Sequence, residues 1–233
     1  MTGEDRKDSD TRGAYSIEKT DRLYPDYLPE QEARLGILHA GKRLYDRGYV
    51  VANDGNISCL TAPGQIWATP TGVSKGFMTE EMLIKSDLEG HILEGTWAPS
   101  TELMMHMRVY KENPGARAAI HAHSPVATAF ACAGIPLDLP ILAEAVAMQG
   151  HVPLAPFALP GTPAVAESIA PFCLAYTGVL LANHGVLTWG ASLSEALYRM
   201  ERVEYYAHLL MLTGVLPQPA KLISPENIAK LRG

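Results

Sequence analysis

Two histidines in one short apolar segment are the first residues of this sequence that could do chemistry. His121 and His123 stand one residue apart in "AAIHAHSPVATAFA", residues 118–131. Because side chains alternate across a strand, both imidazoles point to one face, and Ile120 and Ala122 point to the other. A single buried histidine is ordinarily a hydrogen-bonded core residue. A same-face pair at a strand end is as consistent with two ligands of one metal ion.

A third imidazole follows another apolar segment. His184 in "LLANHGVL" comes after a predicted buried strand and before Gly185, which lets the chain turn sharply and leave the imidazole at the sheet edge. Three neutral imidazoles with an open fourth position are typical of catalytic zinc and not of structural zinc. We therefore predict Zn²⁺ at His121, His123 and His184. Mn²⁺ or Co²⁺ is also possible, because such ligands accept several divalent ions.

Glu102 in "PSTELMMH" is the candidate acid/base. We expect it in the first turn of a helix capped by Ser100 or Thr101, where the helix dipole favours its ionised form. A first-turn glutamate ordinarily only stabilises its helix, so a chemical role requires the metal within reach. We expect His106, one turn further on, to be a packing residue.

Two glycine-containing segments, "NDGNIS" and "TPTGVSKG", could bind a small anion. Glycines beside Asn, Ser and Thr offer donors that can converge on a phosphate, and Lys75 could add positive charge. Both segments are also ordinary hairpin turns by composition, and that alternative stays open. Neither matches a nucleotide-binding fingerprint.

The elements that must position these residues follow from periodicity and caps. An amphipathic helix is expected from about residue 29 to Gly48, with Ala33, Ile37, Leu38, Gly41, Leu44 and Tyr45 on its inner face. Strands are predicted at 56–60, 65–69, 84–88, 91–95, 117–123 and 177–185, the last one ending in a glycine, and further helices at 99–115, 124–134, 162–170 and 192–214. Ser124, Thr162 and Ser192 are the expected N-caps, the last in a capping box with Glu195. Interleaved strands and helices indicate a single α/β domain with a mixed, mainly antiparallel sheet.

The composition of the chain argues against several classes of binding partner. The net charge of −6 and the absence of a Lys/Arg run argue against nucleic acid and anionic membranes. Apolar runs are too short to span a bilayer and the N-terminus is polar, so a cytoplasmic protein is expected. The three cysteines, in unrelated contexts, are expected to be buried free thiols. Residues 1–29 are predicted to be an arm that is mobile or draped on a neighbouring subunit, and residues 30–233 the catalytic domain.

The sequence resembles the class II aldolase/adducin family, in its branch of L-fuculose-1-phosphate aldolase-like zinc lyases. The resemblance is carried by five motifs in this order: "NDGNIS", "TPTGVSKG", "PSTELMMH", "HAH" and "NHG". The match runs from about Pro29 to Leu216. The resemblance implies an α/β/α sandwich, assembled as a homotetramer with interface active sites. It implies zinc binding by the three histidines and an acid/base role for Glu102, which can also bind the metal. It implies phosphate binding by Asn56, Thr71, Gly72, Ser100 and Thr101.

The leading prediction is a zinc-dependent aldehyde-lyase that cleaves a small phosphorylated hydroxy-ketone through a metal-stabilised enediolate. The main alternative is a decarboxylase of a sugar-acid or oxo-acid in the same family. Tyrosines of the fuculose aldolases are missing, one from "PILAEAVAMQG", where Glu144 stands, and one from the C-terminal tail. An epimerase is disfavoured, because that branch carries aspartate in place of Glu102. A non-catalytic adducin-like module and a metallohydrolase are the alternatives of other classes.

Overall fold

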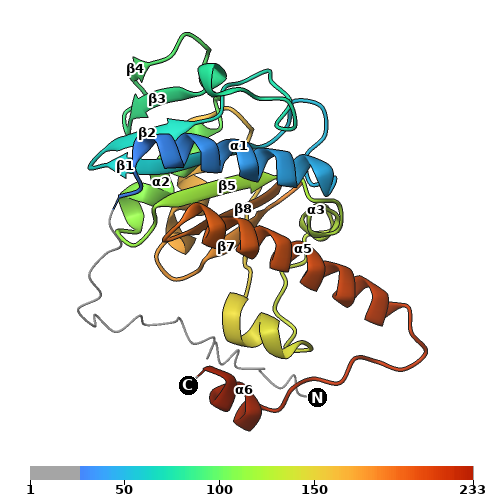
Figure 1. Ribbon diagram of the computed structural model, residues 1–233. Helices are drawn as coiled ribbons and strands as arrows, with labels where there is room; N and C mark the ends of the chain where they lie inside the picture. Colours follow the sequence, from blue (N-terminus) through green and yellow to red (C-terminus); the bar gives the residue numbers. More distant parts are fainter. Residues whose placement is uncertain (1–26, 233) are drawn as a thin grey trace, which may run out of the picture.

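The protein is built on one eight-stranded sheet, seen in a computed structural model that describes residues 27–232 (Figure 1). All but the last three residues of the predicted arm, 1–29, therefore lie outside the described residues. The strand order is β4-β3-β2-β1-β5-β8-β7-β6, and only the β6/β7 pair is parallel. The strands are β1 (Asn56–Ala62), β2 (Gln65–Ala68), β3 (Ile84–Asp87), β4 (Ile92–Glu94), β5 (Ala118–Ala122), β6 (Leu154–Ala155), β7 (Gly178–Leu181) and β8 (Gly185–Gly190). The predicted mixed, mainly antiparallel sheet is confirmed.

Helices cover both faces of this sheet, which makes the predicted α/β/α sandwich. They are α1 (Glu30–Asp46), α2 (Leu103–Glu112), α3 (Pro125–Cys132), α4 (Pro163–Ile169) and α5 (Leu193–Gly214). A sixth helix, α6 (Pro225–Arg232), lies away from the sheet and contacts residues 145–149 (Figure 1). Helices α1, α3 and α5 pack on one face, and α2 and α4 on the other (Figure 1). Because strand residues alternate, Ile57 and Ile120 enter the first core and Leu60 and Ala119 the second.

Helix α1 illustrates how the apolar spacing places a helix. Ala33, Ile37 and Leu44 are fully buried against the sheet, as their spacing predicts. Tyr45 was expected on the same face, and that prediction is wrong. Its side chain is exposed and makes an edge-on ring contact with Phe77, because it lies at the margin of the buried stripe.

The beginnings of two helices differ from the prediction, one in its position and one in its cap. Helix α2 begins at Leu103, so Glu102 occupies the cap position and not the first turn, and the Glu102 backbone N–H donates to Ser100 Oγ at 3.3 Å. Helix α3 begins after Ser124 as expected, but the Ser124 hydroxyl makes no capping bond. The Glu204 carboxylate of α5 accepts the N–H groups of Val126 and Ala127 instead, both at 2.9 Å.

Other local predictions have mixed outcomes. Ser192 caps α5, because its side chain accepts the Glu195 N–H at 3.1 Å. The predicted capping box is incomplete, because the Glu195 carboxylate accepts the N–H of Ala191 and not that of Ser192. Cys59 and Cys173 are buried thiols as predicted, whereas Cys132, at the end of α3, is exposed. Strands β6 and β8 and helix α6 were not predicted. Among the described residues, no helix is long and apolar enough to cross a membrane.

Candidate metal centre

The three predicted histidines converge at one edge of the sheet. His121 is in β5, His123 follows that strand directly, and His184 lies in the turn between β7 and β8. One ring nitrogen from each lies within 4.8 Å of the other two, and Nε2 of His121 is 3.1 Å from Nε2 of His123. Zinc–nitrogen bonds of about 2.1 Å in tetrahedral geometry separate ligand nitrogens by roughly 3.4 Å. The cluster is therefore tight enough for one divalent ion.

Hydrogen bonds outside the cluster decide which nitrogens face inward. Nδ1 of His121 lies 2.8 Å from the Val186 carbonyl oxygen, so Nδ1 donates and Nε2 carries the lone pair. Nδ1 of His123 lies 3.3 Å from a carboxylate oxygen of Asp54. In its neutral form, His123 donates from Nδ1 and likewise turns a bare Nε2 inward. Such outer partners orient the ligands of known metal sites. Two facing lone pairs at 3.1 Å call for a cation between them, so the residues fit a metal.

Burial keeps the central imidazole neutral. His121 is completely buried, and this burial lowers the pKa of its side chain to about 3, although the Glu102 carboxylate acts in the opposite direction. Neutral imidazole is the form that binds a metal, since protonation would occupy the lone pair. His121 is thus ready to bind a metal throughout the neutral pH range.

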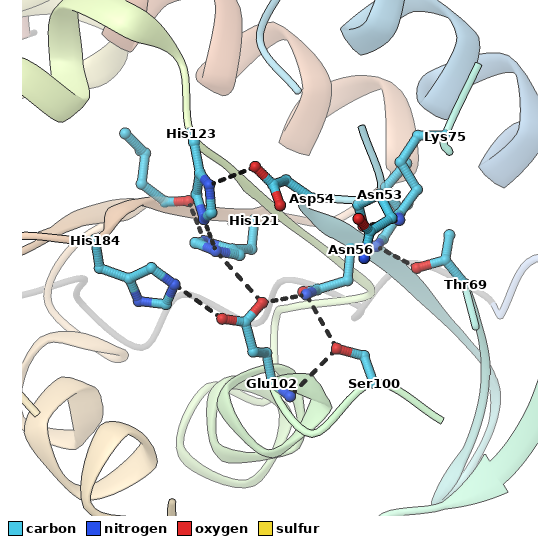
Figure 2. A network of polar contacts seen from close by, with 12 residues as sticks. Asn53, Asp54, Asn56, Thr69, Lys75, Ser100, Glu102, His121, His123 and His184 are labelled. Carbon is cyan, nitrogen blue, oxygen red and sulfur yellow. Dashed lines mark hydrogen bonds and ion pairs between the residues drawn. The ribbon is translucent and has the colours of Figure 1, made fainter. Parts of the chain in front are cut away.

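Glu102 reaches the same cluster from the start of α2. Its carboxylate lies 2.8 Å from His184 Nε2 and 3.6 Å from His121 Nε2, and it accepts the Asn56 amide at 2.8 Å (Figure 2). Burial pushes the pKa of the Glu102 carboxyl upward. The contacts with His184, His121 and Asn56 more than offset that effect, so the pKa lies below its usual range. An ionised carboxylate at this position can bind a metal or accept a proton.

A pocket of about 230 Å³ opens beside the cluster. Thr71, Ser100 and Thr101, three of the predicted phosphate-binding residues, line it together with Glu102 and His123. The other two predicted residues do not line it. The Asn56 amide instead binds Glu102 and contacts Ser100 Oγ at 3.4 Å, and Gly72 is exposed with a positive φ of 75°.

Two further residues considered in the sequence analysis neither line the pocket nor belong to the histidine cluster. Lys75 does not point its ammonium into the pocket; it donates to the carbonyl oxygens of Asn53 and Val73. His106 is completely buried and packs as predicted, with Nδ1 2.8 Å from Ser58 Oγ. Burial lowers the pKa of His106 to about 3.

Sequence reasoning missed Asp54 and misjudged the role of Gly185. Asp54 stands inside the quoted "NDGNIS", but nothing in the pattern shows that its carboxylate meets His123. The left-handed residue of the β7–β8 turn is Asn183, with φ of 56°. Gly185 is needed for close packing: a Cβ there would lie 2.7 Å from both the Ala122 carbonyl oxygen and His123 Cδ2.

An α/β/α sandwich that brings three histidines together at the ends of its strands defines a class of protein, and known structures share the fold. The crystal structure of YgbL from Klebsiella pneumoniae overlays on this chain with a TM-score of 0.82 at 32% identity, over 88% of this chain and 100% of that one. The model of the Class II Aldolase and Adducin N-terminal domain matches residues 36–211. This chain belongs to the class II aldolase/adducin family.

Two groups of relatives carry names of different enzymes. A 3-oxo-tetronate 4-phosphate decarboxylase of Escherichia coli K12 is 34% identical over 207 residues, which cover 87% of this chain and 96% of that protein. An L-fuculose phosphate aldolase of Methanococcus maripaludis is 35% identical over 166 residues, covering 71% and 89%. The family resemblance is confirmed, and relatives of both predicted reaction types exist.

Proposed function

We propose that this protein is a metal-dependent lyase that decarboxylates a small phosphorylated 3-oxo acid. The observation that carries the proposal is the Glu102 carboxylate, held between His184 and Asn56 beside the histidine cluster and facing a pocket lined by threonine and serine. The substrate class comes from the decarboxylase relatives, which match more of this chain than the aldolase relative does.

The three histidines and Glu102 would hold the metal, proposed to be Zn²⁺. When bound, a divalent ion supplies a Lewis acid that stabilises negative charge developing on substrate oxygens. Loss of carbon dioxide from a 3-oxo acid leaves the electron pair of the broken bond on C2, delocalised into the C3 carbonyl, and C2 then takes a proton. Glu102, which is ionised in the resting site, would first take up a proton from solvent and then deliver it to C2. Ser100, Thr101 and Thr71, which line the pocket, would bind the phosphoryl group.

The second candidate is the aldehyde-lyase that the sequence predicts first. It is favoured by the fuculose phosphate aldolase relatives, and it uses the same residues, because breaking a carbon–carbon bond next to a carbonyl leaves the same kind of electron pair. Against it, the stretch expected to carry an aldolase tyrosine has Glu144, which is exposed and outside the pocket lining. The adducin-like module and the metallohydrolase are weaker, because the complete ligand set and the named relatives point to a lyase.

The deciding experiment incubates the metal-loaded protein separately with 3-oxo-tetronate 4-phosphate and L-fuculose 1-phosphate. We expect carbon dioxide without an aldehyde product from the first and no turnover of the second. Aldehyde release from fuculose 1-phosphate alone would replace the decarboxylase with the aldolase. The Glu102→Gln variant should still bind metal through the three histidines, measured by elemental analysis, and lose a factor of about 10² to 10⁴ in kcat. Glu32→Gln, an exposed change on α1, is the matched control.

We further propose a homotetramer with active sites at subunit interfaces. The C-terminal part of α5 and the residues after it expose Met211, Leu212, Val215 and Leu216, an apolar surface that burial against another subunit would remove from water. Light scattering from the purified protein should give the mass of four 25.2 kDa chains. A monomer at micromolar concentration would contradict this proposal.

A further inference from the structure

Lys75 is a buried lysine that the proposed chemistry does not use. Only 2% of the residue is exposed, and its ammonium group donates to the carbonyl oxygens of Asn53 at 2.9 Å and Val73 at 2.7 Å. Burial lowers the pKa of this ammonium to about 8, while the carboxylates of Asp54 and Glu102 act in the opposite direction. Burying a charge is costly unless it is paired, so a buried lysine at this position is expected to have a structural or functional role.

The backbone around Lys75 is fixed against α1 by two glycines. A Cβ on Gly41 of α1 would lie 2.8 Å from the Lys75 carbonyl oxygen, and a Cβ on Gly76 would lie 2.5 Å from the Tyr45 ring. Neither position has room for a side chain. Residues 75 and 76 therefore sit directly on α1, and the lysine side chain extends from a tightly packed backbone.

From there, the lysine reaches a second segment that lines the pocket. Asn53, Asp54 and Gly55 line the pocket, and so do Pro70 and Thr71 from the segment that precedes Lys75. The bond from Nζ to the Asn53 carbonyl is a direct polar link between the two segments. Figure 2 shows Lys75 beside Asn53 at one end of the polar network, with the neighbouring Asp54 extending toward His123.

We propose that Lys75 is a positioning residue: it ties residues 53–55 to residues 70–76 and so sets the shape of the pocket that receives the substrate's phosphoryl group. The same tie steadies Asp54, whose carboxylate orients His123. Without the ammonium, the carbonyl oxygens of Asn53 and Val73 lose their shared donor, and the 53–55 loop loses its polar link to residues 73–75. The inference rests on the proposed function only in assuming that a phosphoryl group binds there.

The test replaces Lys75 by methionine, which keeps the length of the side chain and removes its charge and donors. Binding of inorganic phosphate to the metal-loaded protein is measured by calorimetry, alongside KM and kcat for the phosphorylated substrate. We expect the phosphate Kd and the KM to rise at least about tenfold, as for lost outer-shell partners, with a smaller change in kcat. Lys42→Met, an exposed change on α1, should leave all three unchanged.

A purely structural lysine gives a different result. If Lys75→Met lowers the melting temperature and leaves the phosphate Kd and the KM unchanged, the proposal is overturned. Failure of the wild-type protein to bind phosphate would overturn it as well. If Lys75→Met does not fold, Lys75→Gln, which retains an amide donor, provides the same comparison. Phosphate binding requires no turnover, so this outcome is independent of whether the decarboxylase assignment holds.

Discussion

At the scale of single residues, the candidate metal centre depends on side chains that already use one polar atom in a contact with a neighbouring residue. His121 donates to the Val186 carbonyl and His123 contacts Asp54, so each imidazole has a defined orientation before any metal arrives. Glu102 is similarly held by the Asn56 amide. Preorganised ligands lose little conformational freedom when they bind, which favours both metal affinity and a fixed path for the proton.

A second buried histidine makes stability depend on pH. Unfolded His106 takes up a proton below about pH 6.5, whereas folded His106 stays neutral down to about pH 3. The unfolded state therefore binds more protons in this window, and the free energy of unfolding falls as the pH is lowered. For the metal-stripped protein, the His106→Gln variant should lose about 2 kcal/mol less than wild type between pH 7 and pH 5.

Urea unfolding at the two pH values measures this difference. His208→Gln, which replaces an exposed histidine of α5, should show the same loss as wild type. An equal loss in His106→Gln and wild type would mean that His106 does not govern this pH dependence.

At the scale of elements, the helix that follows His123 is capped from a distance. The Glu204 carboxylate on α5 accepts two N–H groups of α3, while the Ser124 hydroxyl has no partner among the described residues. Glu204→Gln should therefore lower the free energy of unfolding by about 1.5–3 kcal/mol. Ser124→Ala should not lower it, because the hydroxyl that it removes is buried without a partner among the described residues. Chemical denaturation of both variants distinguishes the two caps, and the reverse order would restore Ser124 as the cap.

The turn between β7 and β8 is packed directly onto the metal ligands. A methyl group on Gly185 would lie 2.7 Å from His123 Cδ2 and 3.2 Å from His121 Cε1, so both rings would have to shift. We expect Gly185→Ala to weaken zinc binding by about 10- to 100-fold, measured by competition with a chelating dye. Gly214→Ala, where a Cβ meets open space, is the control. Unchanged zinc affinity in Gly185→Ala would contradict this prediction, because it would show that the turn can move away from the two imidazoles without disturbing the metal site.

At the scale of the whole molecule, one metal ion would join segments that are far apart in the chain. It would link β5, the β7–β8 turn and the start of α2, so its binding should stabilise the complete fold. Excess zinc at about 100 times its Kd adds roughly 2.7 kcal/mol to the free energy of unfolding. Chelation should therefore lower the melting temperature of wild type and of His39→Ala, which changes an exposed histidine. In His121→Ala, chelation should have no effect; an equal response there would place the stabilising ion elsewhere.

Much of the site could be predicted from the sequence because its signals are local. The alternation in "AAIHAH" puts His121 and His123 on one face, and the order of the short motifs identifies the family and, through it, Glu102 and the pocket residues. The periodicity of α1 and α5 and the pattern of short strands likewise indicate the α/β/α sandwich. Each motif and each periodic pattern depends on residues within a few positions of one another, and the order of the motifs can be read directly along the chain.

Only the tertiary structure decided which distant groups meet. Glu204 is 77 and 78 residues from the amides it caps, and Lys75 is 22 residues from the Asn53 carbonyl it binds. The meeting of Asp54 with His123 depends on the antiparallel pairing of β1 with β5, which sets Asn56 opposite His121. Periodicity and capping rules describe contacts within one element, whereas these contacts arise between elements, after packing brings their side chains together.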